Sequence, residues 1–529
     1  WHNLGEDTEA IICFKEALEI NKNSSKAWFE MGVASLGLKE RHNALKFFDE
    51  ALEIDENNVQ AWGTKGNALS KLGRHEEALV CYDRILQIDD EEVEAWHCRG
   101  VTLSNLKRYE EALNCFQRIL QIDDSYVNTW LQASVALSHL GRHEEALVCY
   151  DRILQIDENH VGAWNDKGIM FRDIGRHEEA LVCFDRVLQI DENHMGSRYD
   201  KGMILNNLGR YEEALVCFDR VLQIDENHAI VWYEKGGTLR HLERHEEALV
   251  CYDRALQIGG DQVGTCNNKG VSLLNLGRYE EAIECFDRAL QIDENAVLAW
   301  GNKGIALGYI ERYEEAIVCY DRVLQIDEND VGAWKKKGIA LENLKRFEEA
   351  IECCDRALQI DENDVDTWKK KGNALEKIGK NKEAVQCYNK VLGIKKIITL
   401  MNQGQELIQL QKYEQSLRYY GEVMEIDENY IGAWNDKGIV LLKLRRYEEA
   451  LVCFDRVLQS YENDVPTWND KGVALRNLGR PEEAIECFDR ALKIDENYFN
   501  AWNNKCLALQ NLGMDEEAIE CCDRAIQIG

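Results

Sequence analysis

The chain has 529 residues, 45% of them hydrophobic, and a formal net charge of −33 at pH 7. No apolar run reaches the roughly 18 to 20 residues that a membrane helix needs. The acidic balance disfavours nucleic acid and anionic membrane surfaces as partners, because both are bound through clustered Lys and Arg side chains.

Nearly the same twenty residues recur along the chain. GRHEEALVCYDRILQIDENH at 141–160 returns 34 residues later as GRHEEALVCFDRVLQIDENH at 175–194, and once more with a single change at 209–228. A fixed period of this length overrides the three or four domains that the chain length would suggest. It indicates one extended array of small structural units.

The predicted elements follow one another as copies of one helix hairpin. Residues 1–20 match only its second helix, residues 21–394 form a first segment of the array, and residues 395–529 form a second segment. The segments join at KKIITL, residues 395–400, where the usual linker is two residues shorter, and we expect the superhelical twist to change there. The pattern is under way at the first residue and stops directly after a second helix. We therefore expect a longer polypeptide, or ends that something else covers.

The unit at 161–194 shows why each copy is predicted to be a hairpin. Gly175 tolerates the left-handed conformation that ends a helix, and Glu178 and Glu179 favour the start of the next helix through its dipole. One hairpin cannot bury its own apolar face, so each copy uses its neighbours as its core. The apolar residues fall at helical spacing: Trp164, Gly168, Phe171 and Ile174 before the break, and Ala180, Phe184 and Val187 after it.

These positions resemble those of the tetratricopeptide repeat family, a 34-residue helix–turn–helix unit with Trp, Gly, Ala and Phe or Tyr at set places. The resemblance covers essentially the whole chain and is that of a long array of the prokaryotic type. It implies an all-α fold, an α-solenoid in which the repeats wind into a right-handed superhelix. The family's Pro near the end of the second helix is absent, and Leu400 stands at one Trp position. The tryptophans at this position are Trp28, Trp62, Trp96, Trp130, Trp164, Trp232, Trp300, Trp334, Trp368, Trp434, Trp468 and Trp502.

The resemblance also implies that first helices line a concave groove, where a peptide or a partner helix binds. The residue after the Trp position varies from copy to copy, as ligand contacts do, although solvated drift gives the same scatter. Four polar or aromatic residues at this position are candidate groove contacts: Asn165, Tyr199, Tyr233 and Asn267.

The strongest candidate site is WKKKG at 334–338, which is repeated at 368–372. From residue 335 to residue 396, fifteen Lys or Arg stand against eleven Asp or Glu in an otherwise acidic chain. Such a patch attracts acidic peptides and speeds their encounter. The predicted binding residues are Lys335, Lys336, Lys369, Lys370, Asn373 and Asn402.

Some tetratricopeptide repeat domains hold a partner's C-terminal carboxylate in a clamp of Lys, Asn, Asn, Lys and Arg. Lys369, Asn373 and Asn402 match the first three positions of that clamp. Its last two positions fall on Gly432 and Asp436, so the clamp is incomplete, and Asp436 would repel a carboxylate.

Catalytic and metal-binding motifs are missing from the sequence, so we predict neither an enzyme nor a cofactor or metal. The histidine pairs, such as His139 with His143, are separated by a helix break and are interpreted as packing residues. Fourteen of the nineteen cysteines occupy one repeat position, which favours reduced packing residues and a cytoplasmic location. The adjacent pairs Cys353–Cys354 and Cys521–Cys522 are interpreted as packing residues too.

Three functions remain open at this stage. The first is a non-catalytic scaffold that binds a protein or peptide, possibly an acidic one, in its groove. The second is the sensor or regulatory arm of a larger signalling or defence protein. The third is a structural protein whose ends stack head to tail into filaments.

Overall fold

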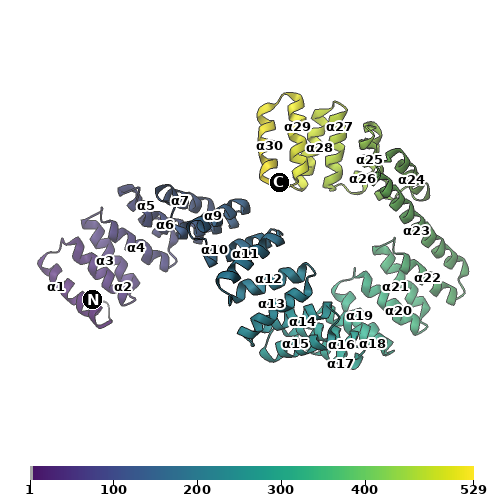
Figure 1. Ribbon diagram of the computed structural model, residues 1–529, viewed down its shortest axis with the longest axis horizontal. Helices are drawn as coiled ribbons and strands as arrows, with labels where there is room; N and C mark the ends of the chain where they lie inside the picture. The colour runs from purple at the N-terminus through teal and green to yellow at the C-terminus, as the bar shows by residue number, and fades with distance from the viewer. Residues whose placement is uncertain (1–3, 529) are drawn as a thin grey trace. The chain divides into compact units, whose positions relative to one another are not determined.

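The computed structural model describes residues 4–528, and this part of the chain consists of 30 α-helices without a β-strand (Figure 1). Within each of the two units described below, the helices pair into hairpins, each of which packs against the next. The prediction of an all-α solenoid built from helix–turn–helix repeats is confirmed, while the handedness of its superhelix stays a prediction.

The hairpins form two compact units, residues 1–278 and residues 279–529. The helices of the first unit are α1 (Leu4–Ile20), α2 (Ser25–Gly37), α3 (Arg41–Ile54), α4 (Val59–Lys71), α5 (His75–Ile88), α6 (Val93–Asn105), α7 (Tyr109–Ile122), α8 (Val127–His139), α9 (His143–Ile156), α10 (Val161–Asp173), α11 (His177–Ile190), α12 (Met195–Asn207), α13 (Tyr211–Ile224), α14 (Ala229–His241), α15 (His245–Ile258) and α16 (Gln262–Asn275). Those of the second unit are α17 (Tyr279–Ile292), α18 (Val297–Tyr309), α19 (Tyr313–Ile326), α20 (Val331–Asn343), α21 (Phe347–Ile360), α22 (Val365–Lys377), α23 (Asn381–Gln409), α24 (Tyr413–Ile426), α25 (Ile431–Lys443), α26 (Tyr447–Ser460), α27 (Val465–Asn477), α28 (Pro481–Ile494), α29 (Phe499–Leu512) and α30 (Asp515–Ile528).

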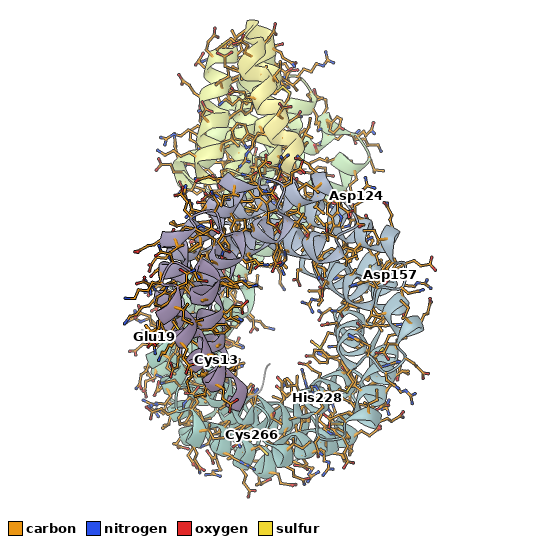
Figure 2. All side chains as sticks on the ribbon, turned by 90° about the vertical axis from the view of Figure 1, so that its left-hand side faces the viewer. Cys13, Glu19, Asp124, Asp157, His228 and Cys266 are labelled. Atoms are coloured by element: carbon orange, nitrogen blue, oxygen red, sulfur yellow. A yellow bond between two sulfur atoms is a disulfide. The ribbon has the colours of Figure 1, made fainter. Side chains whose placement is uncertain are left out.

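Local hydrogen bonds fix both ends of a hairpin turn, as α10 and α11 illustrate. The Nδ1 atom of His160 accepts the backbone N–H of Ala163 at 3.0 Å and so caps the start of α10. After α10, Gly175 adopts a φ of +79°, and the N–H of Arg176 donates to the carbonyl of Phe171 at 2.8 Å. The same kinds of turn recur through both units. In Figure 2, Asp124 and Asp157 mark two successive linkers between hairpins of the first unit.

The core of most hairpins is a glycine of the first helix against an aromatic ring of the second. A Cβ atom added at Gly168 would lie 2.8 Å from the ring of Phe184, which is fully buried. Glycine at this position lets the two helices approach until the ring closes the core. Two other hairpins differ: Ser134 takes the place of the glycine, with Tyr150 at the ring position, and Cys354 takes the place of the ring, with Gly338 at the glycine position.

The segment at 395–400, which we expected to be a shortened linker, is helical instead. Helix α23 runs for 29 residues from the second helix of one repeat straight into the first helix of the next (Figure 1). The residues IKKIITL at 394–400 include no Gly, Pro, Asp or Asn, so no residue there favours a turn. The division of the array at residues 394 and 395 stays a prediction.

The last hairpin has neither the glycine nor the aromatic ring of this contact. Cys506 stands at the glycine position of α29, Cys522 stands at the aromatic position of α30, and the two form a disulfide with Cα atoms 5.6 Å apart. Cys522 packs against the buried cluster of Cys506 and Leu509, as interpreted, but its disulfide was not predicted. It was missed because only cysteines of one repeat position were compared, whereas the bond joins two different positions within one hairpin.

Candidate peptide-binding face

We call the side chains that lie one, two and five residues after the Trp position the first-helix face. In the first unit, this face is hollowed into a cavity of about 560 Å³ between α2, α4 and α6. Phe29, Val33 and Gly63 line it from the first helices, and Glu30 and Glu94 lie among its lining residues. The first-helix face therefore has room for a ligand side chain.

A second part of the first-helix face combines two tyrosines with a carboxylate. Tyr199 of α12 and Tyr233 of α14 are both half-buried, and Glu234 follows Tyr233 directly. The hydroxyl of Tyr233 accepts a hydrogen bond from the Asn268 amide at 2.9 Å. The ring of Tyr199 lies 6.4 Å from that of His228. Two of the predicted groove residues thus lie beside one acidic side chain.

The Glu234 carboxylate has no partner for its charge. Between residues 4 and 528 it forms no ion pair and accepts no hydrogen bond, and burial raises its pKa. Burial also raises the pKa of Tyr199 and of Tyr233, and the negative charge of Glu234 raises both further. The carboxylate is therefore close enough to both phenols for its charge to be felt at each.

The neighbouring first helices supply further polar groups. On α12, Asp200 pairs with Arg172 of α10 at 2.6 Å, although burial outweighs this cation and raises the pKa of Asp200. The predicted groove residue Asn165 accepts the Ser197 hydroxyl at 2.7 Å. The fourth candidate of this set, Asn267 of α16, is 9% exposed and therefore offers little surface to a ligand.

Sequence reasoning missed Asp200 and Glu234, because in the first unit it considered only the residue directly after the Trp position as a groove contact. The next position along was the useful one. In the second unit, Asp436 and Asp470 occupy it, and burial raises the pKa of both carboxyls. A row of acids in an otherwise variable position was therefore the available signal.

Most of the predicted lysine patch is already neutralised by ion pairs. Lys335 lies 2.6 Å from Asp364, and Lys370 lies 2.7 Å from Asp366. The third lysine of each WKKKG segment serves the repeat itself: Lys337 pairs with Asp321 and Lys371 with Asp355, each at 2.5 Å. These last two also lie over the indole rings of Trp334 and Trp368.

Two lysines of the patch remain exposed and without an ion pair among the described residues, Lys336 and Lys369. Lys335 and Lys370 flank a small cavity of about 10 Å³, which is too small for more than a water molecule. Asn373 accepts the Tyr388 hydroxyl at 2.9 Å. Asn402 is exposed on α23.

The carboxylate clamp suggested by the sequence meets an acid at its end. Asp436 is half-buried on α25 and accepts the Gln405 amide at 3.2 Å. Burial raises its pKa, because the charged carboxylate is poorly solvated, and a partner's carboxylate beside it would add electrostatic repulsion. The predicted site of Lys369, Asn373 and Asn402 stays a prediction. In the lysine patch, Lys336 and Lys369 are the two exposed lysines without an ion pair among the described residues.

The remaining sequence candidates pack within the array. His139 stacks on Tyr109 with ring centroids 4.5 Å apart, and His241 stacks on Tyr211. Cys183 is one of the fourteen cysteines at the shared repeat position, and burial raises its pKa to about 11, so its thiol stays protonated. In the described part of the chain, no helix combines the length and apolar character of a membrane span.

The stacked hairpins with a shared glycine–aromatic core define an α-solenoid repeat protein. Two models of the tetratricopeptide repeat together match most of the chain. The chain belongs to the tetratricopeptide repeat family, whose arrays are protein-interaction scaffolds. One model matches residues 59–91, 93–126, 197–228, 264–296, 297–330, 331–364 and 465–498. The other matches residues 2–24, 25–58, 127–160, 161–194, 229–258, 365–397, 399–430, 431–464 and 499–528.

Three solved structures illustrate the likeness. YrrB, described as a TPR protein with an unusual peptide-binding site, is 24% identical with a TM-score of 0.32, over 36% of this chain and 97% of that chain. MamA from Desulfovibrio magneticus RS-1 is 23% identical with a TM-score of 0.31, over 32% and 94%. A chain from the structure of Naa15/Naa10 bound to HypK-THB is 14% identical with a TM-score of 0.34, over 98% and 96%. A search among curated proteins finds no match.

Proposed function

We propose that the chain is a non-catalytic scaffold whose first-helix face binds an extended peptide, with a basic side chain of the peptide at Glu234. The observation that carries this proposal is the half-buried Glu234 carboxylate, which lies near Tyr199 and Tyr233 and has no cationic partner. A Lys or Arg side chain satisfies such a group through a charge-assisted hydrogen bond, while the phenol faces attract the same cation.

Energetics favour a ligand at this place over a purely structural role. A carboxylate that is desolvated without a partner costs stability in the free protein. A bound cation removes that cost and forms the hydrogen bonds that the fold leaves unmade, so part of the binding energy is stored in the free scaffold. Little order is lost by the preformed helices, and the peptide carries most of the entropy cost.

A selection from a random library of nine-residue peptides on the immobilised protein tests the proposal. Wild-type protein is expected to enrich peptides that contain Lys or Arg beside apolar residues. Glu234→Gln keeps the shape of the side chain and removes its charge, and is expected to abolish the enrichment of Lys and Arg. Glu226→Gln, an exposed glutamate in the linker before α14, is the charge-matched control. Equal enrichment by the Glu234 variant contradicts the proposal.

Exposed lysines favour a second contact of the same scaffold, for acidic residues. Lys336 and Lys369 lie on the neighbouring first helices α20 and α22, outside the ion pairs that hold Lys335 and Lys370. The proposal is that an acidic peptide segment binds there, mainly through its charge. Binding of a labelled poly-glutamate peptide at low salt, measured by fluorescence anisotropy, should be lost in Lys336→Glu/Lys369→Glu. Unchanged affinity in that variant counts against the site.

A further inference from the structure

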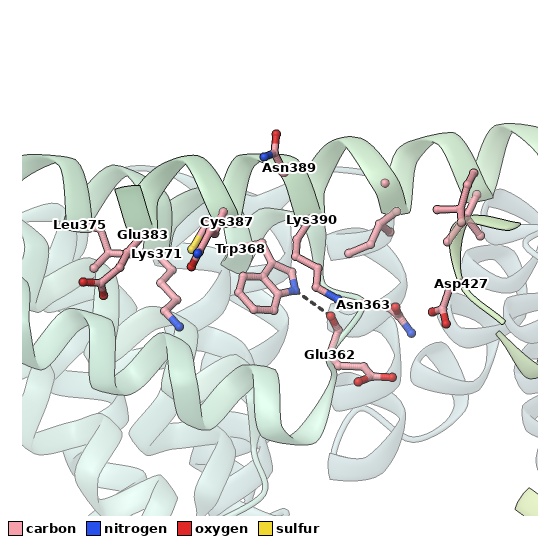
Figure 3. A pocket seen from close by; sticks show the side chains of 15 residues that line it. Glu362, Asn363, Trp368, Lys371, Leu375, Glu383, Cys387, Asn389, Lys390 and Asp427 are labelled. Atoms are coloured by element: carbon pink, nitrogen blue, oxygen red, sulfur yellow. Dashed lines mark hydrogen bonds between the residues drawn. The ribbon is translucent and has the colours of Figure 1, made fainter. Parts of the chain in front are cut away.

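One cavity in the second unit lies where the array has lost a linker. It has a volume of about 790 Å³ and is lined by side chains from α22, α23 and the end of α24 (Figure 3). In Figure 3, α23 passes along the cavity as one unbroken helix, with Trp368 and Lys390 between it and the turn at Glu362. The indole N–H of Trp368 donates to the Glu362 carbonyl at 2.7 Å, which holds the ring in place.

An ordinary hairpin of the same unit provides an internal comparison. A groove of about 430 Å³ between α26, α27 and α28 is lined by Trp468, Lys471 and Cys487, which correspond to Trp368, Lys371 and Cys387 of the larger cavity. The larger cavity adds a wall made by the middle of α23. Two linkers close the ends of this wall: Glu362 and Asn363 come from the linker before α22, and Asp427 comes from the linker after α24.

The comparison also shows what closes this space elsewhere. Trp468 packs in one cluster with Tyr498 and Trp502, which come from the next linker and the next first helix. The residue at the corresponding Trp position of α23 is Leu400, and it is buried in another cluster, against α24 and α25. Trp368 packs in a cluster with residues of its own hairpin, such as Leu375, and with Ile351 of α21. The space beside Trp368 is therefore the place that an aromatic side chain fills in an ordinary repeat.

Charges along α23 favour an acidic occupant. Most linkers begin with Asp-Glu, but the corresponding residues here are Lys395 and Lys396. Both are exposed, as is Lys390, and none of the three forms an ion pair among residues 4–528. Three acids line the cavity: Glu362 and Asp427 from the flanking linkers, and Glu383 from the start of α23. The basic stretch thus lies where the negative charge of a linker is missing.

We propose that this cavity binds a segment of a partner protein in which acidic residues precede a tryptophan, so that the partner supplies the linker and the indole that the repeat lacks. The indole lies against Trp368, Ile394 and Ile397, which line the cavity. The acidic residues lie toward Lys390, which also lines it, and toward the exposed Lys395 and Lys396, which follow on α23. The site lies beside the second helix of a repeat and uses none of the first-helix residues near Glu234. It is therefore independent of the function proposed above.

The probe is a fluorescein-labelled peptide, DENDVGAW, which copies residues 327–334 of the chain itself. Fluorescence anisotropy with the full chain is expected to show saturable binding. Replacing the peptide's Trp with Ala should weaken binding roughly 30-fold or more, as for an aromatic hot spot in a desolvated pocket. No saturable binding overturns the proposal.

Two glycines provide a blocking variant and its matched control. Gly393 lines the cavity and Gly421 lies in α24 outside it, and a Cβ added at either meets no atom within 4 Å. Gly393→Phe is expected to fill the cavity and abolish binding, whereas Gly421→Phe leaves the affinity unchanged. Far-UV circular dichroism verifies that both variants keep their helices. Equal affinities in both variants, or equal losses, overturn the proposal.

Further outcomes identify the occupant. Lys395→Glu/Lys396→Glu should weaken binding at low salt, and the difference should shrink at high salt because exposed charges are screened. Binding that is lost in Lys336→Glu/Lys369→Glu instead places the acidic peptide on the first-helix face and contradicts this site. Sedimentation that shows self-association of the protein, abolished by Gly393→Phe, overturns the partner segment in favour of a second copy of the chain.

Discussion

Gly372→Ala and Gly338→Ala test the glycine–aromatic contact that closes most hairpins, because Gly372 faces an aromatic ring and Gly338 does not. Both glycines end a WKKKG segment in a first helix, so Ala brings each the same gain in helix propensity, about 0.8 to 1 kcal/mol. The new methyl group meets different neighbours. At Gly372 it would lie 2.7 Å from the Tyr388 ring, whereas at Gly338 the nearest atom is the Cβ of Cys353 at 3.4 Å.

The magnitudes follow from this difference. Overpacking of a closed core costs about 1–3 kcal/mol, so Gly372→Ala is expected to be destabilising by up to about 2 kcal/mol after the gain in propensity. Gly338→Ala is expected to be stabilising by about 0.8 to 1 kcal/mol, because its methyl group makes an ordinary contact. The propensity cancels in the difference between the variants, which therefore measures the overpacking alone.

Native-state hydrogen exchange, resolved by peptide, is the suitable assay. An array of repeats opens locally, so a single free energy of unfolding does not report on one hairpin. Protection of α22 and the first half of α23 should fall in Gly372→Ala, and protection of α20 and α21 should rise in Gly338→Ala. Shifts of the same sign and size in the two variants would refute the account of the core.

Three further predictions concern charge and redox state. Burial raises the pKa of Glu234, so the folded state favours its protonated form and loses stability as the pH rises through that pKa. Glu234→Gln should therefore increase hydrogen-exchange protection of α14 at pH 7, with no gain at pH values below the unfolded pKa of the carboxyl. Reduction of Cys506–Cys522 should destabilise α29 and α30 by about 3 kcal/mol, the value for a loop of about 15 residues, and exchange rates with and without dithiothreitol measure it. Lys336→Glu/Lys369→Glu should remove binding of acidic peptides without loss of thermal stability, because neither lysine forms an ion pair within the described residues.

Periodicity in the sequence was sufficient to predict the hairpins, because their core is repeated in every copy. The burial of Glu234 was not predictable, nor was the effect of its charge on Tyr199, which lies 35 residues earlier in the neighbouring hairpin. The partner of Lys335 was not predictable for a similar reason, because Asp364 lies in the following linker, 29 residues further along the chain. Long-range pairing of this kind leaves no periodic signal.

Two features were predictable in principle. The residues IKKIITL at 394–400 lack every residue type that favours a turn, which indicates the continuous helix α23. The change from Gly to Cys506 coincides with the change from an aromatic residue to Cys522, so both partners of the contact change together. In both cases the informative residues are those that differ from the repeat. The residues they replace would have formed a turn at 394–400 and a glycine–aromatic contact in the last hairpin.

The most direct test of the central claim is a double-mutant cycle on the first-helix face. The affinity of a selected Lys-containing peptide and of its Lys→Gln version is measured by titration calorimetry against wild-type protein and Glu234→Gln. If the Lys contacts Glu234, the coupling energy between the two changes should be about 1.5 kcal/mol or more, as for close charge pairs at interfaces. A coupling energy within about 0.3 to 0.5 kcal/mol of zero, the range for independent sites, would contradict the claim that Glu234 receives a basic side chain.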